Sequence, residues 1–221
     1  MSYRVWLASA SARRMSCLGE RFPDLVVEQR SLDGHEESRQ STISVNEQVM
    51  EICRSKADEA ISRWPGDDCD LLALVSDTLV ADPDSVNLAL GQPEDEMSAL
   101  SMLSRLSGRI HAVWSATALI VSKDSNLMCD IGGNGELLVK PGFCAWMWVE
   151  RALVEIEELG AHALDDLIHS GSWKGKAGGY DMAGAMREYS HLIEGEEIVV
   201  LGFAEAAMAS IQEIIGSRPR E

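Results

Sequence analysis

Two adjacent arginines near the start of the chain, Arg13 and Arg14, have the residue type and position to bind phosphate. The apolar residues 4–8 predict a short strand, and Ser11 is a typical N-cap for a helix that begins at residue 12. Free N–H groups in the first turn of a helix favour an anion, and arginine adds paired charged donors suited to phosphate. The spacing therefore indicates a polyphosphate-binding turn, although two arginines there are equally typical of a solvated surface.

A carboxylate follows the most apolar run of the chain. Residues 71–75 indicate a strand buried on both faces, and Ser76-Asp77-Thr78 come directly after it. In α/β proteins, ligands gather beyond the carboxyl ends of such strands. Asp77 is therefore the carboxylate best placed to hold a metal ion or to take a proton from water. An isolated aspartate at the end of a strand can equally form a turn.

Lysines could complete a phosphate site. Ser44 precedes an amphipathic helix, and Lys56 lies beside the apolar stripe of that helix, where it either extends to solvent or points along the edge of the core into a site. A later glycine-rich segment, residues 170–180, carries Lys174 and Lys176 without the Walker A pattern.

Three carboxylates lie in the polar, turn-rich residues 31–38: Asp33, Glu36 and Glu37. Magnesium takes oxygen ligands, and it usually binds only one or two protein carboxylates together with phosphate and water. This segment is therefore either part of a metal site or a solvated acidic loop.

Composition limits the classes of partner. The 221 residues carry a net charge of -17, which would repel nucleic acid and anionic membranes at long range, so any cationic site must be local. No apolar run approaches the roughly 20 residues that a membrane span needs. The five cysteines are odd in number and widely spaced, which argues against a disulfide framework and against a zinc site. We therefore expect a cytoplasmic globular protein that binds neither nucleic acid nor membrane.

Hydrophobic periodicity and turn signals predict alternating helices and strands. Beyond the elements above, we expect strands at 24–28, 110–121, 148–156 and 198–202, and helices at 94–106, 161–169 and 204–215. In the helix at 94–106, the residues expected to face inward are Met97, Leu100, Leu103 and Leu106.

An ordered set of short motifs resembles the Maf family of nucleoside triphosphate pyrophosphatases. Each motif is weak alone, but together they run in the family's order from residue 5 to about residue 205. The set comprises Leu7-Ala-Ser-x-Ser-x-Arg13-Arg14, Lys56-Ala57, Ser76-Asp77-Thr78, Gly91-x-Pro93-x-Asp95, Leu106-Ser-Gly-Arg-x-His111 and Lys176-Ala-Gly-x-Tyr180.

The resemblance implies an α/β fold similar to the inosine triphosphate pyrophosphatases, with an elongated mixed β-sheet flanked by helices and two lobes around a central cleft. Residues 1–221 would form this single domain. The implied reaction is the attack of metal-bound water on the α-phosphorus of an ordinary or modified nucleoside triphosphate, which yields a nucleoside monophosphate and pyrophosphate. The resemblance also implies Mg²⁺ or Mn²⁺ as cofactor, a house-cleaning role in nucleotide metabolism and assembly as a homodimer.

Residue roles carry over only where the motifs match. The resemblance implies Asp77 as proton acceptor and metal ligand, with Lys56 and Lys176 as catalytic cations. It implies Glu36 or Glu37 as a further metal ligand, and the acidic motif does not distinguish them. The implied substrate-binding positions are Ser9, Arg13, Arg14, Thr78 and Ala183.

Several positions depart from the family pattern. The proline before the two arginines is Ala12, the lysine of Gly-Lys-Pro is Gln92, and the late Ser-Asn-Val-Val-Gly has lost its asparagine. Where the family commonly has Tyr-Gly-Ile-Gln-Gly, this chain has Tyr180-Asp-Met-Ala-Gly184, so that Ala183 replaces a substrate-selecting glutamine. These losses favour the alternative of a catalytically impaired nucleotide-binding or regulatory protein. The retained set favours the enzyme: Arg13, Lys56, Asp77, Thr78 and Lys176.

Overall fold

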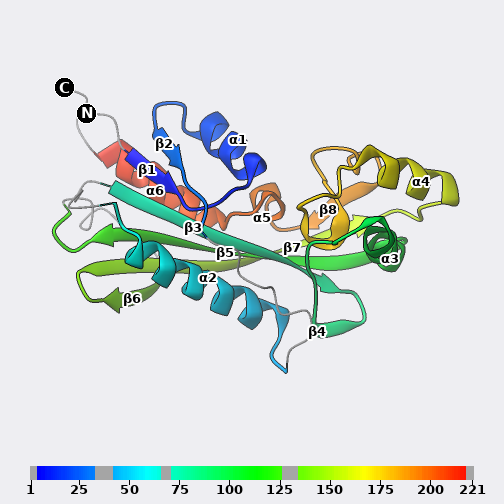
Figure 1. Cartoon of the computed structure of the whole chain (residues 1–221), viewed down its shortest axis with the longest axis horizontal. Helices are drawn as coiled ribbons and strands as arrows, with labels where there is room; N and C mark the ends of the chain where they lie inside the picture. The colour runs from blue at the N-terminus through cyan, green and yellow to red at the C-terminus, as the bar shows by residue number, and fades with distance from the viewer. Residues whose placement is uncertain (1–3, 33–41, 66–70, 126–133, 218–221) are drawn as a thin grey trace.

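The computed structural model describes residues 4–32, 42–65, 71–125 and 134–217 (Figure 1). The acidic motif with Glu36 and Glu37 lies outside the described residues. In chain order, the elements are β1 (Arg4–Leu7), α1 (Ala12–Arg21), β2 (Val26–Gln29), α2 (Val45–Ser62), β3 (Leu71–Asp82), β4 (Ser85–Leu90), α3 (Glu96–Leu106), β5 (Arg109–Ser122), β6 (Glu136–Lys140), β7 (Phe143–Ile156), α4 (Ala161–Ser170), a 3-10 turn η2 (Ala177–Gly179), β8 (Ser190–Glu194), α5 (Glu197–Leu201) and α6 (Glu205–Ser217).

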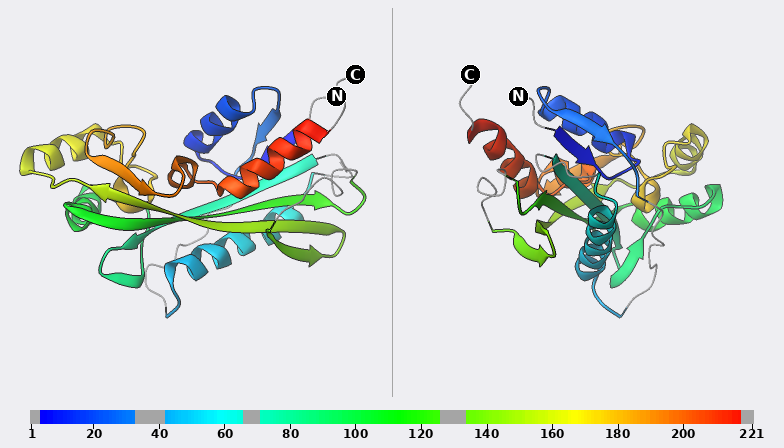
Figure 2. Two further views of the ribbon diagram at one scale, coloured as in Figure 1. Left: turned by 180° about the vertical axis from the view of Figure 1, so that it is seen from behind. Right: turned by 60° about the vertical axis from the view of Figure 1, so that its left-hand side comes forward.

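A mixed sheet of eight strands runs through the described part of the chain, in the order β2-β1-β3-β5-β7-β6. β4 pairs with β3, and β8 pairs with β7. β1 is parallel to β2 and β3, whereas the other pairs are antiparallel. β5 and β7 pair along all 14 residues of each strand, and this long pair gives the molecule its elongated shape (Figure 2). The predicted elongated α/β fold is confirmed.

Helices cover both faces of the sheet (Figures 1 and 2). α2 packs on one face through a stripe of small and branched residues that includes Val49, Cys53 and Ala57, all buried against β3 and β5. α1, α5 and α6 cover the opposite face, where a second core contains Leu18, Phe203 and Met208. Because each helix buries one apolar stripe, the predicted amphipathic patterns are satisfied by a single sheet between two helical layers.

The strand that carries Asp77 is longer than predicted. β3 does not end at Val75 but continues to Asp82, so Asp77 lies in the middle of the strand. The polar side chains do not end the strand because antiparallel pairing with β5 continues through them, with Asp77 opposite Ala116. The hydroxyl of Ser76 donates to the carbonyl of Ala116, which satisfies a buried polar group inside the sheet.

The strand predicted at 198–202 is wrong, because residues 198–201 belong to the short helix α5, which is followed by the cap residue Gly202 with φ of 113°. A short apolar run has the same pattern in a buried helix and in a buried strand, so periodicity could not decide between them. Met97 is also 72% exposed rather than inward, since Ala99 takes the buried position on α3. Three further strands, β4, β6 and β8, were not predicted from the sequence.

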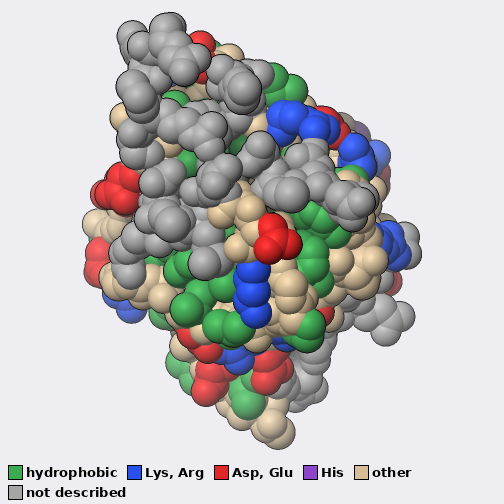
Figure 3. All heavy atoms as spheres, turned by 90° about the vertical axis from the view of Figure 1, so that its left-hand side faces the viewer, with side chains coloured by type: hydrophobic (Ala, Val, Ile, Leu, Met, Phe, Trp, Pro, Cys, Tyr) green, Lys and Arg blue, Asp and Glu red, His purple; other side chains and the backbone are tan. Residues whose placement is uncertain are grey.

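The charged side chains on the surface and the lengths of the helices match what the composition predicts. Figure 3 shows one end of the molecule, where Lys and Arg side chains lie interspersed with Asp and Glu side chains. Among the described residues, none of the helices combines the length and the apolar character needed to cross a membrane.

Candidate functional site

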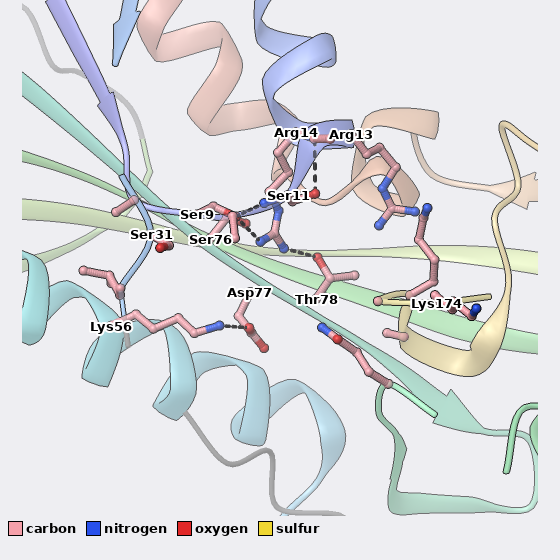
Figure 4. Close-up of a pocket in the computed structure, with 18 of the residues that line it drawn as sticks. Ser9, Ser11, Arg13, Arg14, Ser31, Lys56, Ser76, Asp77, Thr78 and Lys174 are labelled. Carbon is pink, nitrogen blue, oxygen red and sulfur yellow. Dashed lines mark hydrogen bonds and ion pairs between the residues drawn. The ribbon is translucent and has the colours of Figure 1, made fainter. Parts of the chain in front are cut away.

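A cleft of about 900 Å³ lies where the start of α1, the middle of β3, one side of α2 and the lysine segment before η2 meet (Figure 4). Seven of the residues predicted for the site line it: Ser9, Arg13, Arg14, Lys56, Asp77, Thr78 and Lys176. They come from four parts of the chain that only the fold brings together.

The turn between β1 and α1 forms as predicted. Ser11 has an extended backbone and accepts a hydrogen bond from the N–H of Arg14 at 3.3 Å, which identifies it as the N-cap of α1. The N–H of Ser11 in turn donates to Oγ of Ser9 at 3.2 Å. This turn places both arginines at the cleft, but their side chains have different surroundings.

Arg14 joins elements of the fold. Its Nε donates to the carbonyl of Gly202 at 3.1 Å, and its two terminal nitrogens donate to Oγ of Ser9 at 3.3 Å and to Oγ1 of Thr78 at 2.9 Å. The Thr78 hydroxyl also lies 2.8 Å from Oγ of Ser115. Arg14 and Thr78 thus contact each other on the cleft wall, and Arg14 connects α1 to β3 and to the end of α5.

Arg13 has more donor capacity left for a ligand. Its Nε is buried and has no hydrogen-bond partner within the described ranges. Burial lowers the pKa of the Arg13 guanidinium, against the opposing effect of Asp181, but arginine stays charged in proteins. A phosphate oxygen in the cleft would satisfy such a buried, charged donor.

Asp77 and Lys56 form an ion pair at the centre of the cleft (Figure 4). The Asp77 side chain is 4% exposed and the Lys56 side chain 20%. Lys56 therefore points from α2 into the site rather than out to solvent. Only Oδ1 of Asp77 is engaged by Lys56, and the buried Oδ2 has no partner in the described part of the chain. Cys53 of the same helix is uncharged, because burial, with a contribution from Asp77, raises its pKa to about 12.

A glycine, Gly178, lets the segment that carries Lys174 and Lys176 lie close against the sheet. Gly178 has φ of 70°, its N–H donates to the carbonyl of Gly91 at 3.0 Å, and an added Cβ would meet Val80 of β3 at 3.0 Å. This close approach places Lys176 on the cleft wall, with its Nζ 3.0 Å from Oδ2 of Asp181. Lys174 of the same glycine-rich segment also lines the cleft, and so does Gln92, which stands where the family pattern has a lysine.

The described residues offer a magnesium-type ion few protein ligands in the cleft. Oδ2 of Asp77 is a buried carboxylate oxygen without a partner among the described residues, which is the type of ligand such an ion takes. No group of three or more His, Cys, Asp or Glu side chains suited to a metal occurs within those residues. Magnesium commonly takes one or two carboxylates and completes its shell with phosphate and water, so Asp77 can serve as its protein ligand here.

Ala183 lies away from the cleft. It lines a separate pocket of about 400 Å³, together with Met182, Arg187, Ser190, Leu192 and Glu197. The last residue of this segment that lines the cleft is Ala177. Beyond it, the buried hydroxyl of Tyr180 lies 2.8 Å from Nε2 of His111, and the next residues form a tight turn. The structure therefore does not bring Ala183 together with the other predicted substrate-binding residues.

The chain is similar to known proteins along most of its length. The family model described as Maf-like protein matches residues 4–212. Three similar curated proteins are each named dTTP/UTP pyrophosphatase. The protein from Pyrococcus abyssi is 28% identical and covers 98% of both chains. The protein from Zymomonas mobilis is 31% identical over 91% of this chain and 86% of its own. The protein from Clostridium acetobutylicum is 27% identical over 90% of this chain and 91% of its own.

Proposed function

The chain belongs to the Maf-like protein family, and from this premise we propose that it is a nucleoside triphosphate pyrophosphatase. It would cleave the bond between the α- and β-phosphates, releasing a nucleoside monophosphate and pyrophosphate. One observation carries the proposal: Asp77, with a buried oxygen that lacks a partner among the described residues, lies in the same cleft as Arg13, Lys56 and Lys176. The names of the relatives are consistent with this reaction.

The chemistry follows from the positions of these charges. Phosphoryl transfer is catalysed mainly by positioning and by cations opposite the phosphate oxygens. Arg13 and Lys176 bind those oxygens and orient the triphosphate, with the N–H groups at the start of α1 close by. Asp77 accepts the proton of the attacking water, and Lys56 holds the carboxylate in a fixed orientation.

We further propose that activity requires Mg²⁺ or Mn²⁺, held by Asp77 and by the substrate phosphates. Glu36 and Glu37 stay candidates for a further ligand outside the described residues. Such an ion supplies positive charge opposite the phosphate oxygens and lowers the pKa of bound water. A cytoplasmic location and assembly as a homodimer stay predictions from the sequence.

The experiment measures pyrophosphate release from UTP, dTTP, CTP, ATP and GTP with each metal, and it resolves the products by chromatography. We expect monophosphate and pyrophosphate from at least one triphosphate, and loss of release when EDTA removes the metal. Orthophosphate with a nucleoside diphosphate would contradict the proposed bond cleavage. The neutral Gln92 in the cleft favours one alternative, nucleotide binding without turnover, which triphosphate binding without product would support.

A further inference from the structure

Asp181 lies outside the lining of the cleft, yet its carboxylate contacts a cation that does line it. The Nζ atom of Lys176 is 3.0 Å from Oδ2 of Asp181. The two side chains are only 22% and 19% exposed, respectively. Because partly buried charges are screened less by salt and water than surface charges, this ion pair restrains Lys176 more strongly than a surface pair would.

The backbone of Asp181 is anchored on both sides. Its carbonyl accepts hydrogen bonds from the N–H of Gly184 at 3.0 Å and from the N–H of Met186 at 3.1 Å. The preceding Tyr180 is buried, and its hydroxyl lies 2.8 Å from Nε2 of His111 in β5. The carboxylate therefore projects from a fixed position relative to the sheet.

The same carboxylate acts on a second cation. Arg13 is half-buried and lines the cleft, and Asp181 is the charged group that most strongly favours its protonated form. Nε of Arg13 and Oδ1 of Asp181 are both buried, and neither has a hydrogen-bond partner among the described residues. One carboxylate thus lies in the electrostatic field of two cations, and its second oxygen is not engaged by either.

We propose that Asp181 is a positioning residue that stabilises Lys176 and Arg13 side by side and orients them toward a triphosphate in the cleft. Two like charges in a partly desolvated site repel each other, and a carboxylate behind them offsets that repulsion. A lysine has three donors, so the contact with Asp181 leaves N–H groups of Lys176 for phosphate, and the Nε–H of Arg13 is not used by a hydrogen bond within the described residues. The inference rests on the proposed pyrophosphatase function and adds a residue to its site.

The kinetic test uses Asp181→Asn, which keeps the size of the side chain and removes its charge. Both cations stay charged, so attraction of the triphosphate is retained, but their orientation at the transition state is lost. We expect kcat to fall at least about tenfold while KM rises no more than about twofold. Asp181→Glu restores the carboxylate and should recover part of kcat.

The matched control is Asp58→Asn, which breaks an ion pair with Lys140 of 2.6 Å outside the cleft lining. This variant should keep the wild-type kcat and KM. A role of Asp181 in folding alone would lower the melting temperature of Asp181→Asn and leave kcat per folded molecule within about twofold of wild type. That result would overturn the inference.

A double-mutant cycle separates this inference from the proposed function. Calorimetry measures binding of inorganic tripolyphosphate to the wild type, Asp181→Asn, Lys176→Ala and the double variant. If Asp181 acts through Lys176, the loss of affinity caused by Lys176→Ala differs between the two backgrounds by at least about threefold. This binding readout decides the inference even if the wild type hydrolyses no triphosphate. Additive effects, or no binding by the wild type, would overturn it.

Discussion

Asp77 is the nearly enclosed carboxylate of the cleft, and its chemistry is open to a direct test. Asp77→Asn preserves the shape of the side chain but removes the charge that accepts a proton. We expect pyrophosphate release to fall by about 10²–10⁴-fold, the usual contribution of a general base. A melting curve should show that the variant still folds.

The matched control for Asp77→Asn is Asp24→Asn, since Asp24 is exposed and lies outside the cleft lining. It loses the same charge and should keep the wild-type rate. Near-wild-type turnover by Asp77→Asn would remove Asp77 from the proposed mechanism.

Gln92 is a neutral side chain on the wall of a cationic cleft. Gln92→Lys adds a positive charge and three donors for a phosphate group. We therefore expect KM for the triphosphate to fall about tenfold, equivalent to about 1.4 kcal/mol of binding free energy. Steady-state kinetics at constant ionic strength measure this change.

Gln212→Lys is the matched control for Gln92→Lys, because it makes the same charge change on the exposed surface of α6. Its KM should equal that of the wild type. If both variants lower KM to the same extent, the effect comes from the overall charge of the molecule, and Gln92 does not face the phosphates.

At the scale of elements, the end of α5 is packed directly against the cleft. Gly202 has φ of 113°, and an added Cβ would lie 2.7 Å from Nε of Arg14 and 3.3 Å from Oγ1 of Thr78. Gly202→Ala therefore strains the backbone and displaces the arginine that joins α1 to β3. We expect a loss of about 1–3 kcal/mol in the free energy of unfolding, measured with urea, together with reduced activity.

Gly216→Ala provides the comparison, since nothing lies within 4 Å of its added Cβ in α6. Alanine is a better helix former than glycine by up to about 1 kcal/mol, so this variant should be as stable as the wild type or more stable. Equal destabilisation of the two variants would show that contact with Arg14 is not what requires glycine at position 202.

At the scale of the whole molecule, a buried histidine couples the long sheet to the lysine segment. His111 of β5 is 3% exposed, lies 2.8 Å from the hydroxyl of Tyr180, and has its pKa lowered to about 4 by burial. The pKa of an unfolded histidine is about 6.5. The unfolded state therefore binds more protons between these values, so this contribution is fully present above pH 6.5 and is lost as the pH falls toward 4.

This shift predicts the acid sensitivity of the fold. Protonation of unfolded His111 should remove on the order of 3 kcal/mol of unfolding free energy across that range. In His111→Gln, the difference between unfolding free energies at pH 7 and pH 4.5 should be smaller than in the wild type. The exposed His162→Gln should match the wild type. An equal pH dependence in all three proteins would contradict the role of His111.

Local signals in the sequence determined several helices and strands of this protein, its family and most of its candidate site. The Ser11 cap, the apolar stripe of α2 and the long pattern of β5 depend on neighbouring residues, so they predicted their elements directly. The ordered motifs likewise predicted the family, and seven of the predicted site residues line one cleft.

Only the tertiary structure decided which polar residues face one another. The apolar residues of α5 have no local preference strong enough to choose helix over strand, and packing against β5 and β7 decided it. The tight turn after Tyr180 places Ala183 in the lining of a separate pocket and brings Asp181 into an ion pair with Lys176. Arg14 donates a hydrogen bond to the carbonyl of Gly202, which is 188 residues away in the sequence. Such contacts depend on how the elements pack, because hydrogen bonds and ion pairs act over a few ångströms and carry no signal in residue spacing.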